Sequence, residues 1–428
     1  MSETRIEDWL AELAQCRCRL HERDFLLTWD HSLDDLRAVV LTARVLEALW
    51  RQNISARVFD GGLAVSIFRD QSTRTRFSFA SAASLVGLTV QDFDETRSQV
   101  AHGETVRETA NMISFLTEVI GIRDDLFIGA GHEYQCQVAR ALADGHQQGV
   151  LPQRATVINL QSDVDHPTQT LTDLAHLQET FGSLDALRGR RIAMTWAYSP
   201  SYGKPLSVAQ GVIALMTRFG MHVTLAHPPG YDLMQEVVDR SARQAVESGG
   251  SFRVVQDMAE AFVDADVVYP KSWAPYSVMC ERTDLLRGGQ AAELGKLEKH
   301  CLELNARHRE WECNAAMMAR TREGRALYMH CLPADISGVS CPAGEVAADV
   351  FERYRVRTYR QAGYKPFVIG ALILLTRFPD VPSLLRTCAE RRRPRRGAAG
   401  HAAGGPTESF GRSPPPANHA PTARGHAG

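Results

Sequence analysis

The spacing of apolar and polar residues changes period along the first part of the chain. Residues 36–49 place apolar side chains three and four positions apart, which predicts an amphipathic helix. Residues 63–68 form a short apolar run that opens after two glycines and ends in a polar cluster, which is typical of a strand. Residues 78–85 return to helical spacing, so the predicted order is strand, loop, helix.

The same alternation of short apolar runs and helical patterns repeats as far as residue 329. Strands that alternate with helices indicate parallel sheets covered by helices. The pattern falls into two series, so we expect an α/β fold with two doubly wound parallel-sheet domains and a boundary near residues 181–189. The expected strands are residues 119–122, 126–128, 155–160, 191–196, 223–226, 252–255, 267–269 and 327–329, and the expected helices are residues 170–179, 208–219 and 231–248.

Length and composition agree with this organisation and exclude several classes of protein. A chain of 428 residues with 44% hydrophobic residues suits a globular protein of two domains. A formal net charge of -2 gives no indication of a nucleic acid or a membrane as partner. The longest apolar stretch, residues 367–375, is too short to span a bilayer, and residues 1–13 lack the basic start of a secretory signal. We therefore expect a cytoplasmic protein.

Two further features concern metal binding and the end of the chain. The nine cysteines are scattered and form no CxxC pair, which predicts no metal site. Residues 389–428 are rich in Pro, Gly, Ala and Arg, and we expect this low-complexity tail to be disordered. Its Arg cluster could contact an acidic partner, although a solvated tail is the simpler interpretation.

The first candidate for chemistry is the sequence STRTR at residues 72–76, directly after the strand at residues 63–68. A helix that begins here turns unpaired backbone N–H groups and the positive end of its dipole outward, and such a helix start binds anions. Three hydroxyls add donors, and Arg74 adds a planar cation that suits phosphate. A surface turn with a helix cap is the alternative, so this motif alone indicates phosphate only weakly.

The second candidate is DHPTQ at residues 165–169, which follows the strand at residues 155–160. Ligands of open α/β sheets sit beyond the carboxyl ends of the strands. His166 and Gln169 lie three positions apart at a helix start, so both can face one crevice. An imidazole can donate to a carbonyl oxygen, and a carboxamide can bind an NH2 group. A helix start capped by proline, with incidental polar residues, is the alternative.

Two weaker candidates also follow strands. HCLP at residues 330–333 contains Cys331, but the sequence shows no base partner for it, so a structural cysteine is the default interpretation. The proline bends the chain and leaves backbone carbonyls exposed as acceptors. Arg123 lies in GIRDD after the strand at residues 119–122, and it gains weight only if the other strand ends converge on it.

Together and in this order, the four motifs resemble the aspartate/ornithine carbamoyltransferase family over roughly residues 24–378. The resemblance implies that a carbamoyl group passes from carbamoyl phosphate to an amine or amide nitrogen, with no metal or other cofactor. It also implies a homotrimer with active sites between subunits. The implied domains are a carbamoyl-phosphate-binding domain at residues 1–182, completed by a C-terminal helix at residues 364–388, and an acceptor domain at residues 183–363.

Within this family, the chain is similar to the knotted branch that includes acetylornithine carbamoyltransferase and several uncharacterised members. The similarity lies in the loop at residues 198–206, YSPSYGKPL, and in the sequence KSW at residues 271–273. The loop sits where that branch threads its chain to form a knot, so the resemblance implies a knot in the second domain.

The resemblance also implies a role for each motif residue. Thr75, Arg123 and His166 would act on the carbonyl oxygen, where negative charge builds during attack. Gln169 would bind the carbamoyl NH2 group, and Gln99 would enter the site of a neighbouring subunit. The implied residues that bind carbamoyl phosphate are Ser72, Thr73, Arg74, Thr75, Gln99, Arg123, His166, Gln169, Cys331, Leu332 and Lys365.

The acceptor side departs from the familiar members of the family. Lys365 stands where the family usually has an Arg, and residues 334–338 lack the basic residues of acetylornithine binding. The Ser-Met-Gly acceptor motif of ornithine enzymes is also missing. Lys271 and Trp273 are the expected acceptor-binding residues, and they favour a small anionic acceptor, for which oxamate in ureide breakdown is one candidate.

Two other functions are alternatives to this interpretation. A Rossmann dehydrogenase needs GxGxxG between a strand and a helix, and neither half of the chain has that sequence. A non-catalytic protein that binds carbamoyl phosphate on the same fold stays open as an alternative, because a fold does not determine a function.

Overall fold

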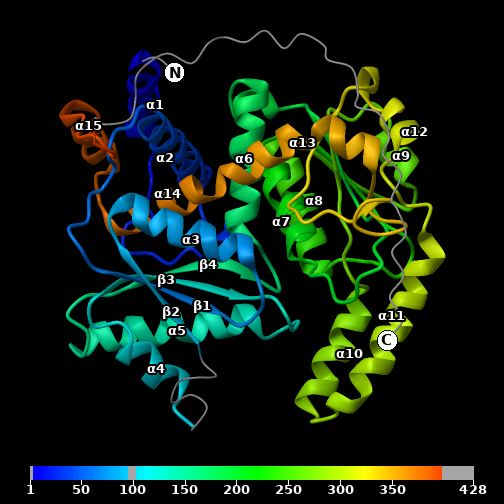
Figure 1. Cartoon of the computed structure of the whole chain (residues 1–428), viewed down its shortest axis with the longest axis horizontal. Coiled ribbons are helices and arrows are strands. Elements are labelled where there is room, and N and C mark those ends of the chain that lie inside the picture. The colour runs from blue at the N-terminus through cyan, green and yellow to red at the C-terminus, as the bar shows by residue number, and fades with distance from the viewer. Residues whose placement is uncertain (1–2, 95–102, 398–428) are drawn as a thin grey trace, which may run out of the picture. The chain divides into compact units, whose positions relative to one another are not determined.

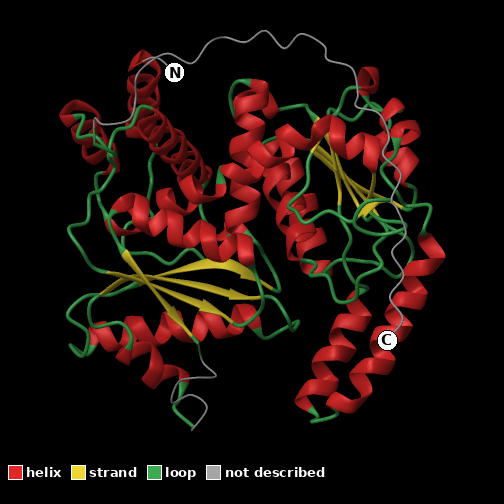
Figure 2. Cartoon of the chain, in the orientation of Figure 1, coloured by secondary structure: helices red, strands yellow, loops and turns green. Residues whose placement is uncertain are grey.

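The computed structural model describes residues 3–94 and 103–397. Gln99 and the tail from residue 398 onward lie outside these ranges, so the predictions that concern them stay predictions. Within the described ranges, helices and strands alternate through both halves of the chain (Figure 1). The strands form two larger sheets that share no strand (Figure 2).

The first sheet has four parallel strands in the order β2-β1-β3-β4. Val65 and Ile67 of β1 pack with Ile120 of β3 under α5, whereas Ala64 faces the main hydrophobic core on the other side of the sheet. Successive strand residues thus bury opposite faces, as a sheet covered by helices on both sides requires. The elements of this half are α1 (Glu3–Gln15), α2 (Leu33–Arg51), β1 (Leu63–Phe68), α3 (Thr73–Val86), β2 (Thr89–Phe93), α4 (Val106–Met112), β3 (Thr117–Asp124), α5 (Gly131–Gln147), β4 (Thr156–Ser162) and α6 (Pro167–Phe181).

Local sequence signals set where several of these helices begin and end. Ser32 and Asp35 form a capping box at the start of α2, in which each side chain accepts from the other residue's backbone N–H. Pro167 opens α6, where its missing N–H costs nothing. Gly87 ends α3 with φ of +110°, and a Cβ atom there would lie 2.3 Å from the Phe59 carbonyl oxygen, so only glycine fits.

The second sheet has five parallel strands in the order β7-β6-β5-β8-β9. Helices α7, α8, α9 and α13 pack against its strands. The elements of this half are β5 (Arg191–Thr195), α7 (Ser207–Arg218), β6 (His222–Ala226), α8 (Gln235–Ser248), β7 (Ser251–Val255), α9 (Met258–Phe262), β8 (Val267–Pro270), α10 (Tyr276–Arg287), α11 (Leu294–Asn305), α12 (Ala315–Ala319), β9 (Leu327–Tyr328), the short parallel pair β10 (Ile336–Ser337) and β11 (Val346–Ala347), and α13 (Ala348–Gly363).

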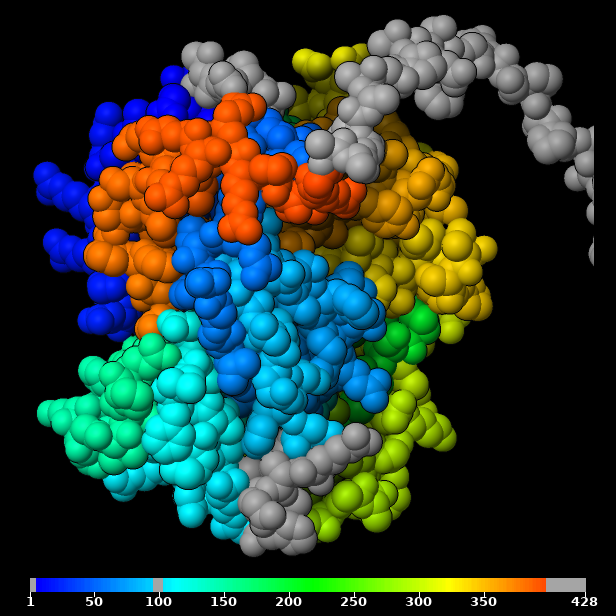
Figure 3. Space-filling model, turned by 60° about the vertical axis from the view of Figure 1, so that its left-hand side comes forward, coloured from blue at the N-terminus to red at the C-terminus, as the bar shows by residue number. Residues whose placement is uncertain are grey.

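The chain then returns to the first half through α14 (Lys365–Arg377) and α15 (Val381–Arg391). Helix α14 packs against α2, α3 and β4, and α15 packs against α1 and α2. Figure 3 shows these orange C-terminal helices against the blue N-terminal residues. The C-terminal segment therefore packs on the first domain as expected, although it forms two helices rather than one.

The predicted start of the tail at residue 389 is wrong. Helix α15 continues to Arg391, and the backbone beyond it pairs with the segment after α2. Ser55 N–H donates to the Arg393 carbonyl at 2.8 Å, and Arg395 N–H donates to the Asn53 carbonyl at 2.8 Å. These backbone hydrogen bonds extend the ordered chain to residue 395 in spite of its polar composition.

The parallel α/β class is confirmed, and most predicted strands match a strand of the structure. The strand predicted at residues 126–128 is wrong, because these residues form the turn between β3 and α5. Its apolar side chains pack against the protein instead of pairing with a strand, and Ile128 belongs to the main core. The pattern missed β2, an edge strand whose residues are half-buried or exposed. The knot stays a prediction.

No single helix of the described residues is long and apolar enough to cross a membrane. Residues 348–377 and 381–391 pass that test only as a pair bent by 120°, by length and composition alone, and the apolar part of this pair, α14, is buried against the first domain. Among the same residues, no group of three or more His, Cys, Asp or Glu side chains is placed to hold a metal ion.

Candidate active site

The candidate site residues lie where the strand order of each sheet reverses. In the first sheet, β2 lies on one side of β1 and β3 on the other, so the loops after β1 and β3 diverge. In the second sheet, β6 and β8 flank β5 in the same way. Ligands of open parallel sheets bind in the crevice at such a point. Arg74 follows β1 and Arg123 lies at the end of β3, while Lys204 follows β5 and Lys271 follows β8.

A pocket of about 250 Å³ joins these strand ends. Its described lining includes five cationic side chains and no carboxylate, which suits a small, strongly anionic ligand. Predicted site residues on its wall are Arg74, Thr75, Arg123, His166, Lys271, Cys331, Leu332 and Lys365. The residues that sequence reasoning did not assign to the site are Gln71, Gln161, Lys204, Pro205, Val208 and Pro333.

A larger hollow of about 850 Å³ adjoins this pocket and shares Gln71, Arg123 and Pro205 with it. Its described lining carries three arginines against four aspartates. A dianion is therefore better accommodated in the smaller pocket, where no acidic side chain opposes it.

The STRTR motif forms the start of α3. The Ser72 hydroxyl oxygen accepts from the Thr75 backbone N–H at 3.3 Å and so caps the helix. Arg74 extends into the pocket, whereas Arg76 turns away, pairs with Asp92 and lies over the Phe68 ring. Ser72 and Thr73 do not line the pocket. Among the described residues, Arg74 forms no ion pair, which leaves its guanidinium available to an anion.

Arg123 is held by contacts from three sides. Its Nε donates to Asp70 and one terminal nitrogen donates to Gln161. The other terminal nitrogen donates to Asp125 Oδ2 at 3.0 Å. A guanidinium has five donors, so three such bonds leave two for a ligand while the plane is held in position. Gln161 also donates to the Ser207 hydroxyl at 3.0 Å, which ties the end of β4 to the start of α7.

His166 occupies the residue before α6 and is buried against the pocket. Its Nδ1 lies 3.4 Å from the Thr168 hydroxyl. Burial lowers the pKa of His166 well below its ordinary value, and the cations Lys365, Arg123 and Arg74 lower it further. The imidazole is therefore neutral, so one ring nitrogen can donate its N–H and the other can accept a hydrogen bond.

Gln169 lies one turn into α6 and is buried beside the pocket rather than on its wall. Its amide nitrogen donates to Asp173 Oδ1 at 2.7 Å. Because the amide nitrogen is used in this hydrogen bond, the amide oxygen of Gln169 remains available to accept one from another group.

Three residues of the HCLP motif, Cys331, Leu332 and Pro333, also line the pocket. Leu332 has φ of +54° and precedes a cis peptide bond to Pro333, and its N–H donates to His330 Nδ1 at 2.9 Å. Burial raises the pKa of the Cys331 thiol, which disfavours the thiolate form. Cys331 thus contributes backbone and shape to the pocket, in agreement with its interpretation as a structural cysteine.

Lys365 begins α14 and lies buried on the pocket wall. Burial is the main cause that lowers the pKa of Lys365 to about 7; the nearby Arg123 and Arg74 act in the same direction, and Cys331 and Asp173 oppose them. An arginine here would stay charged at any physiological pH, whereas this lysine gains or loses its proton near neutrality. The position is also the positive end of a helix, so a bound anion meets two favourable charges.

We expect Lys365→Arg to change how anion binding depends on pH. An anion in the pocket favours the charged lysine, so binding near pH 8 should take up about one proton in the wild type. Affinity should fall as pH rises through 7, because charging the lysine then costs free energy. The variant keeps its charge, so the part of the pH dependence that comes from the lysine should be absent, and only the ionisation of phosphate itself should remain. Calorimetry with phosphate in buffers of different ionisation enthalpy measures the uptake, and equal uptake in both proteins would contradict this assignment.

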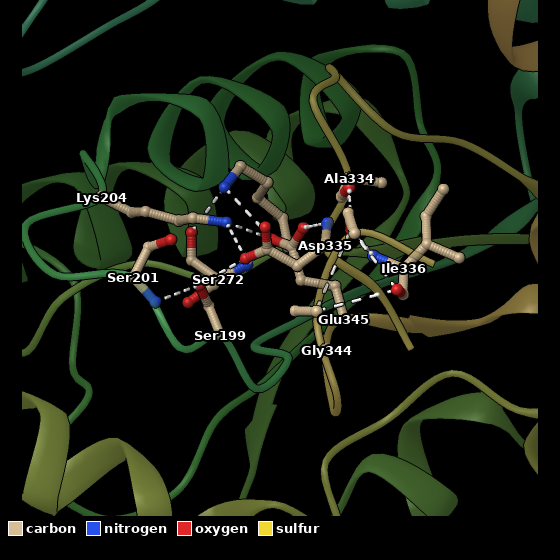
Figure 4. Close-up of polar contacts among 12 residues, drawn as sticks. Ser199, Ser201, Lys204, Ser272, Ala334, Asp335, Ile336, Gly344 and Glu345 are labelled. Carbon is tan, nitrogen blue, oxygen red and sulfur yellow. Dashed lines mark hydrogen bonds and ion pairs between the residues drawn. The ribbon is translucent and has the colours of Figure 1, made fainter. Parts of the chain in front are cut away.

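Two lysines of the second half are held by one buried carboxylate (Figure 4). Glu345 Oε1 lies 3.3 Å from Lys271 Nζ and 3.4 Å from Lys204 Nζ, and it accepts from the Ser272 N–H at 2.7 Å. Burial alone would raise the pKa of Glu345, but Lys271, Lys204 and a contact with His330 hold it well below its ordinary value. Because both ammonium groups share one oxygen, they lie close together on the pocket wall.

Asp335 completes this cluster. Its carboxylate accepts from Lys204 Nζ at 2.6 Å and from the Ser199 hydroxyl at 2.5 Å. Its backbone N–H donates to Glu345 Oε2 at 2.8 Å, and its carbonyl accepts from the Glu345 N–H at 2.7 Å. Gly344 permits this close approach, because a Cβ atom there would lie 2.3 Å from the Asp335 carbonyl oxygen. Burial alone would lower the pKa of Lys204, but the carboxylates of Glu345 and Asp335 outweigh it and raise that pKa, so the lysine is charged.

The assignment of Trp273 to the acceptor site is wrong. The Trp273 ring is buried in the core of the second half and does not line the pocket. Its indole N–H donates to the Tyr231 carbonyl at 2.8 Å, and its own carbonyl accepts from the Trp196 indole. A large ring whose only polar atom is satisfied inside the core is a packing residue.

Comparison with known proteins places the chain among enzymes of one family. Residues 23–179 match the family domain described as "Aspartate/ornithine carbamoyltransferase, carbamoyl-P binding domain". Residues 203–376 match the "Aspartate/ornithine carbamoyltransferase, Asp/Orn binding domain". The chain is 59% identical over 380 residues to a protein of Escherichia coli (strain K12) named "Putative carbamoyltransferase YgeW", which covers 89% of this chain and 96% of that protein.

More distant relatives have named acceptors. The N-acetylornithine carbamoyltransferase of Xanthomonas axonopodis pv. citri (strain 306) is 34% identical over 267 residues, which cover 59% of this chain and 73% of that protein. A crystal structure of N-acetyl-L-ornithine transcarbamylase superimposes with a TM-score of 0.65 at 26% identity, covering 82% of this chain and 98% of the other. Ornithine carbamoyltransferase from Pyrococcus furiosus gives a TM-score of 0.65 at 24% identity, over 83% of this chain and 97% of that one, which supports the fold.

Proposed function

The chain belongs to the aspartate/ornithine carbamoyltransferase family and is a carbamoyltransferase, and from this premise we propose that it moves the carbamoyl group of carbamoyl phosphate to a nitrogen of a small, anionic acceptor. The observation that carries the proposal is the pocket at the two switch points, whose described wall has five cations and no carboxylate. The reverse, catabolic direction uses the same groups, because the transition state is the same in both directions.

On the donor side, Arg74 and the start of α3 would bind the phosphate, together with Lys365. Ser72 and Thr73 would contribute through the main chain, since their side chains do not line the pocket. Gln169 and the carbonyls of Cys331 and Leu332 would accept from the carbamoyl NH2 group. Gln99 would reach the site of a neighbouring subunit in a homotrimer.

The reaction is a direct transfer. A neutral acceptor nitrogen attacks the carbamoyl carbon, the new N–C bond forms, and the bond from carbon to the phosphate oxygen breaks. The departing phosphate takes the proton that the nitrogen loses, so the atoms and charges balance. Negative charge builds on the carbonyl oxygen meanwhile, and Thr75, Arg123 and neutral His166 line the pocket to stabilise it. The other contribution is positioning of the two reactants.

On the acceptor side, Lys271 and Lys204 support an acceptor that carries a carboxylate. Each ammonium group has three N–H donors, and each makes two of its contacts within the cluster of Glu345, Asp335 and Ser272. One donor on each lysine is then left for a ligand. A carboxylate accepts such charge-assisted hydrogen bonds at about 2.8 Å, and its two oxygens can take one from each lysine.

An acceptor screen tests the proposal. Purified protein is mixed with carbamoyl phosphate and a panel of small amines and amides, with and without a carboxylate and including oxamate, and phosphate release is measured. We expect release that depends on one carboxylate-bearing compound and is lost in Lys271→Met. Tight binding of carbamoyl phosphate with no acceptor-dependent release would favour the alternative of a non-catalytic binding protein.

A further inference from the structure

Asp173 is a fully buried carboxylate that receives hydrogen bonds from three different elements. It lies on α6, one turn beyond Gln169, whose amide nitrogen donates to Asp173 Oδ1 at 2.7 Å. Gln361 of α13 donates to the same oxygen at 2.6 Å. Tyr269 of β8 donates to Oδ2 at 3.1 Å. Asp173 thus joins the helix that follows the HPTQ motif to two elements of the acceptor half.

This arrangement is costly, because a carboxylate buried without a cation in contact loses its hydration. Burial raises the pKa of Asp173 to about 6, although Gln361, Gln169, Lys365 and Tyr269 oppose the rise. An apolar residue would fill the same space without that cost. Unlike an apolar residue, an ionised carboxylate accepts hydrogen bonds and donates none. It therefore bonds to the NH2 end of a neighbouring amide and not to the oxygen end.

The consequence falls on Gln169. A glutamine amide has a donor end and an acceptor end of nearly equal size, and a buried one can turn over unless a partner selects one end. Asp173 can accept only from the nitrogen of Gln169, so the oxygen is the end that remains. The Gln361 amide is held the same way, and its oxygen accepts from the His330 backbone N–H at 3.2 Å.

We propose that Asp173 is a positioning residue that holds the Gln169 amide by its nitrogen, so that the Gln169 oxygen accepts from the carbamoyl NH2 group of the substrate. This inference rests on the proposed function, in which Gln169 binds that group. Asp173 itself has no substrate contact in this proposal, because both of its oxygens already accept from Gln169, Gln361 and Tyr269.

A double-mutant cycle on carbamoyl phosphate binding tests the proposal without any acceptor. The dissociation constant is measured by calorimetry for wild type, Asp173→Ala, Gln169→Ala and the double variant. We expect each single variant to bind up to about tenfold more weakly, which is the upper range of the usual loss for a hydrogen bond between neutral groups. The double variant should bind no more weakly than Gln169→Ala, because Asp173 then has no glutamine to hold.

A matched control separates positioning from stability. Tyr269→Phe removes the donor on the other oxygen of the same carboxylate, and it should leave the dissociation constant at the wild-type value. Asp173→Asn keeps an acceptor oxygen of the same shape, so it should restore part of the affinity that Asp173→Ala loses, and it serves as the test variant if the alanine variant does not fold.

The outcomes are distinct. A lower melting temperature with unchanged affinity in the Asp173 variants would make the residue purely structural and overturn the proposal, as would losses that multiply in the double variant. Failure of the proposed donor site looks different, because the wild type would then bind no carbamoyl phosphate, and failure of the proposed transfer would show only in the acceptor screen.

Discussion

Arg74→Ala should abolish the protection that carbamoyl phosphate gives the protein against heat. Arg74 lies in the first turn of α3, and its guanidinium lines the pocket, whereas that of Arg76 does not. Among the described residues, Arg74 has no carboxylate partner. A ligand at 100 times its dissociation constant stabilises the native state by about 2.7 kcal/mol. The wild type should therefore melt at a clearly higher temperature with carbamoyl phosphate, whereas the variant should show no shift.

The matched control is Arg76→Ala, two residues further along the same helix. Arg76 pairs with Asp92 and lies over Phe68, and it does not line the pocket. Its loss should lower the melting temperature of the free protein but preserve the shift caused by carbamoyl phosphate. Equal shifts in wild type and Arg74→Ala would mean that the phosphate binds elsewhere.

Glu345→Gln should cause the largest loss of stability. Glu345 is fully buried between Lys271, Lys204 and His330, and the neutral amide would leave two lysines without their shared counter-charge. Removing one partner of a buried ion pair costs about 3–5 kcal/mol in the free energy of unfolding. The difference is measured as the shift in denaturation midpoint in urea at pH 7.

The pH dependence of this loss identifies its cause. The pKa of folded Glu345 lies well below its ordinary value of 4.5, so its stabilising effect is fully present above pH 4.5 and is lost as pH falls below that value. The gap between wild type and variant should therefore shrink in acid. Glu352→Gln is the control, because Glu352 is exposed and, among the residues that the structure describes, pairs with Arg355 one turn along the same helix. A gap that persists unchanged at low pH would point to packing rather than charge.

Errors in the predictions came from side chains whose role depends on their neighbours. Trp273 was assigned to the acceptor site because it follows Lys271 by two residues. Its ring is instead buried in the core, where its indole N–H donates to the Tyr231 carbonyl. Residues 126–128 are apolar enough for a strand, yet they cover the core from a turn. The local sequence pattern indicates neither which group accepts from an indole N–H nor which part of the core the apolar residues of a turn will cover.

The sequence by itself determined the alternation of strands and helices, the helix starts at Ser72 and Pro167, and the positions of the polar motifs after the strands. These features depend on spacing and capping within a few residues, which the local chain encodes directly.

Only the tertiary structure decided which strand ends meet. The order of strands within each sheet places β1 beside β3 and β5 beside β8, and this order depends on long-range packing rather than on spacing. It brings Lys204 to Asp335, 131 residues further along, and Lys271 to Glu345, 74 residues further along. The sequence motifs around Arg74, Arg123 and His166 could thus be recognised locally, whereas the pocket that joins them to Lys204 and Lys271 exists because the strand order of each sheet reverses there.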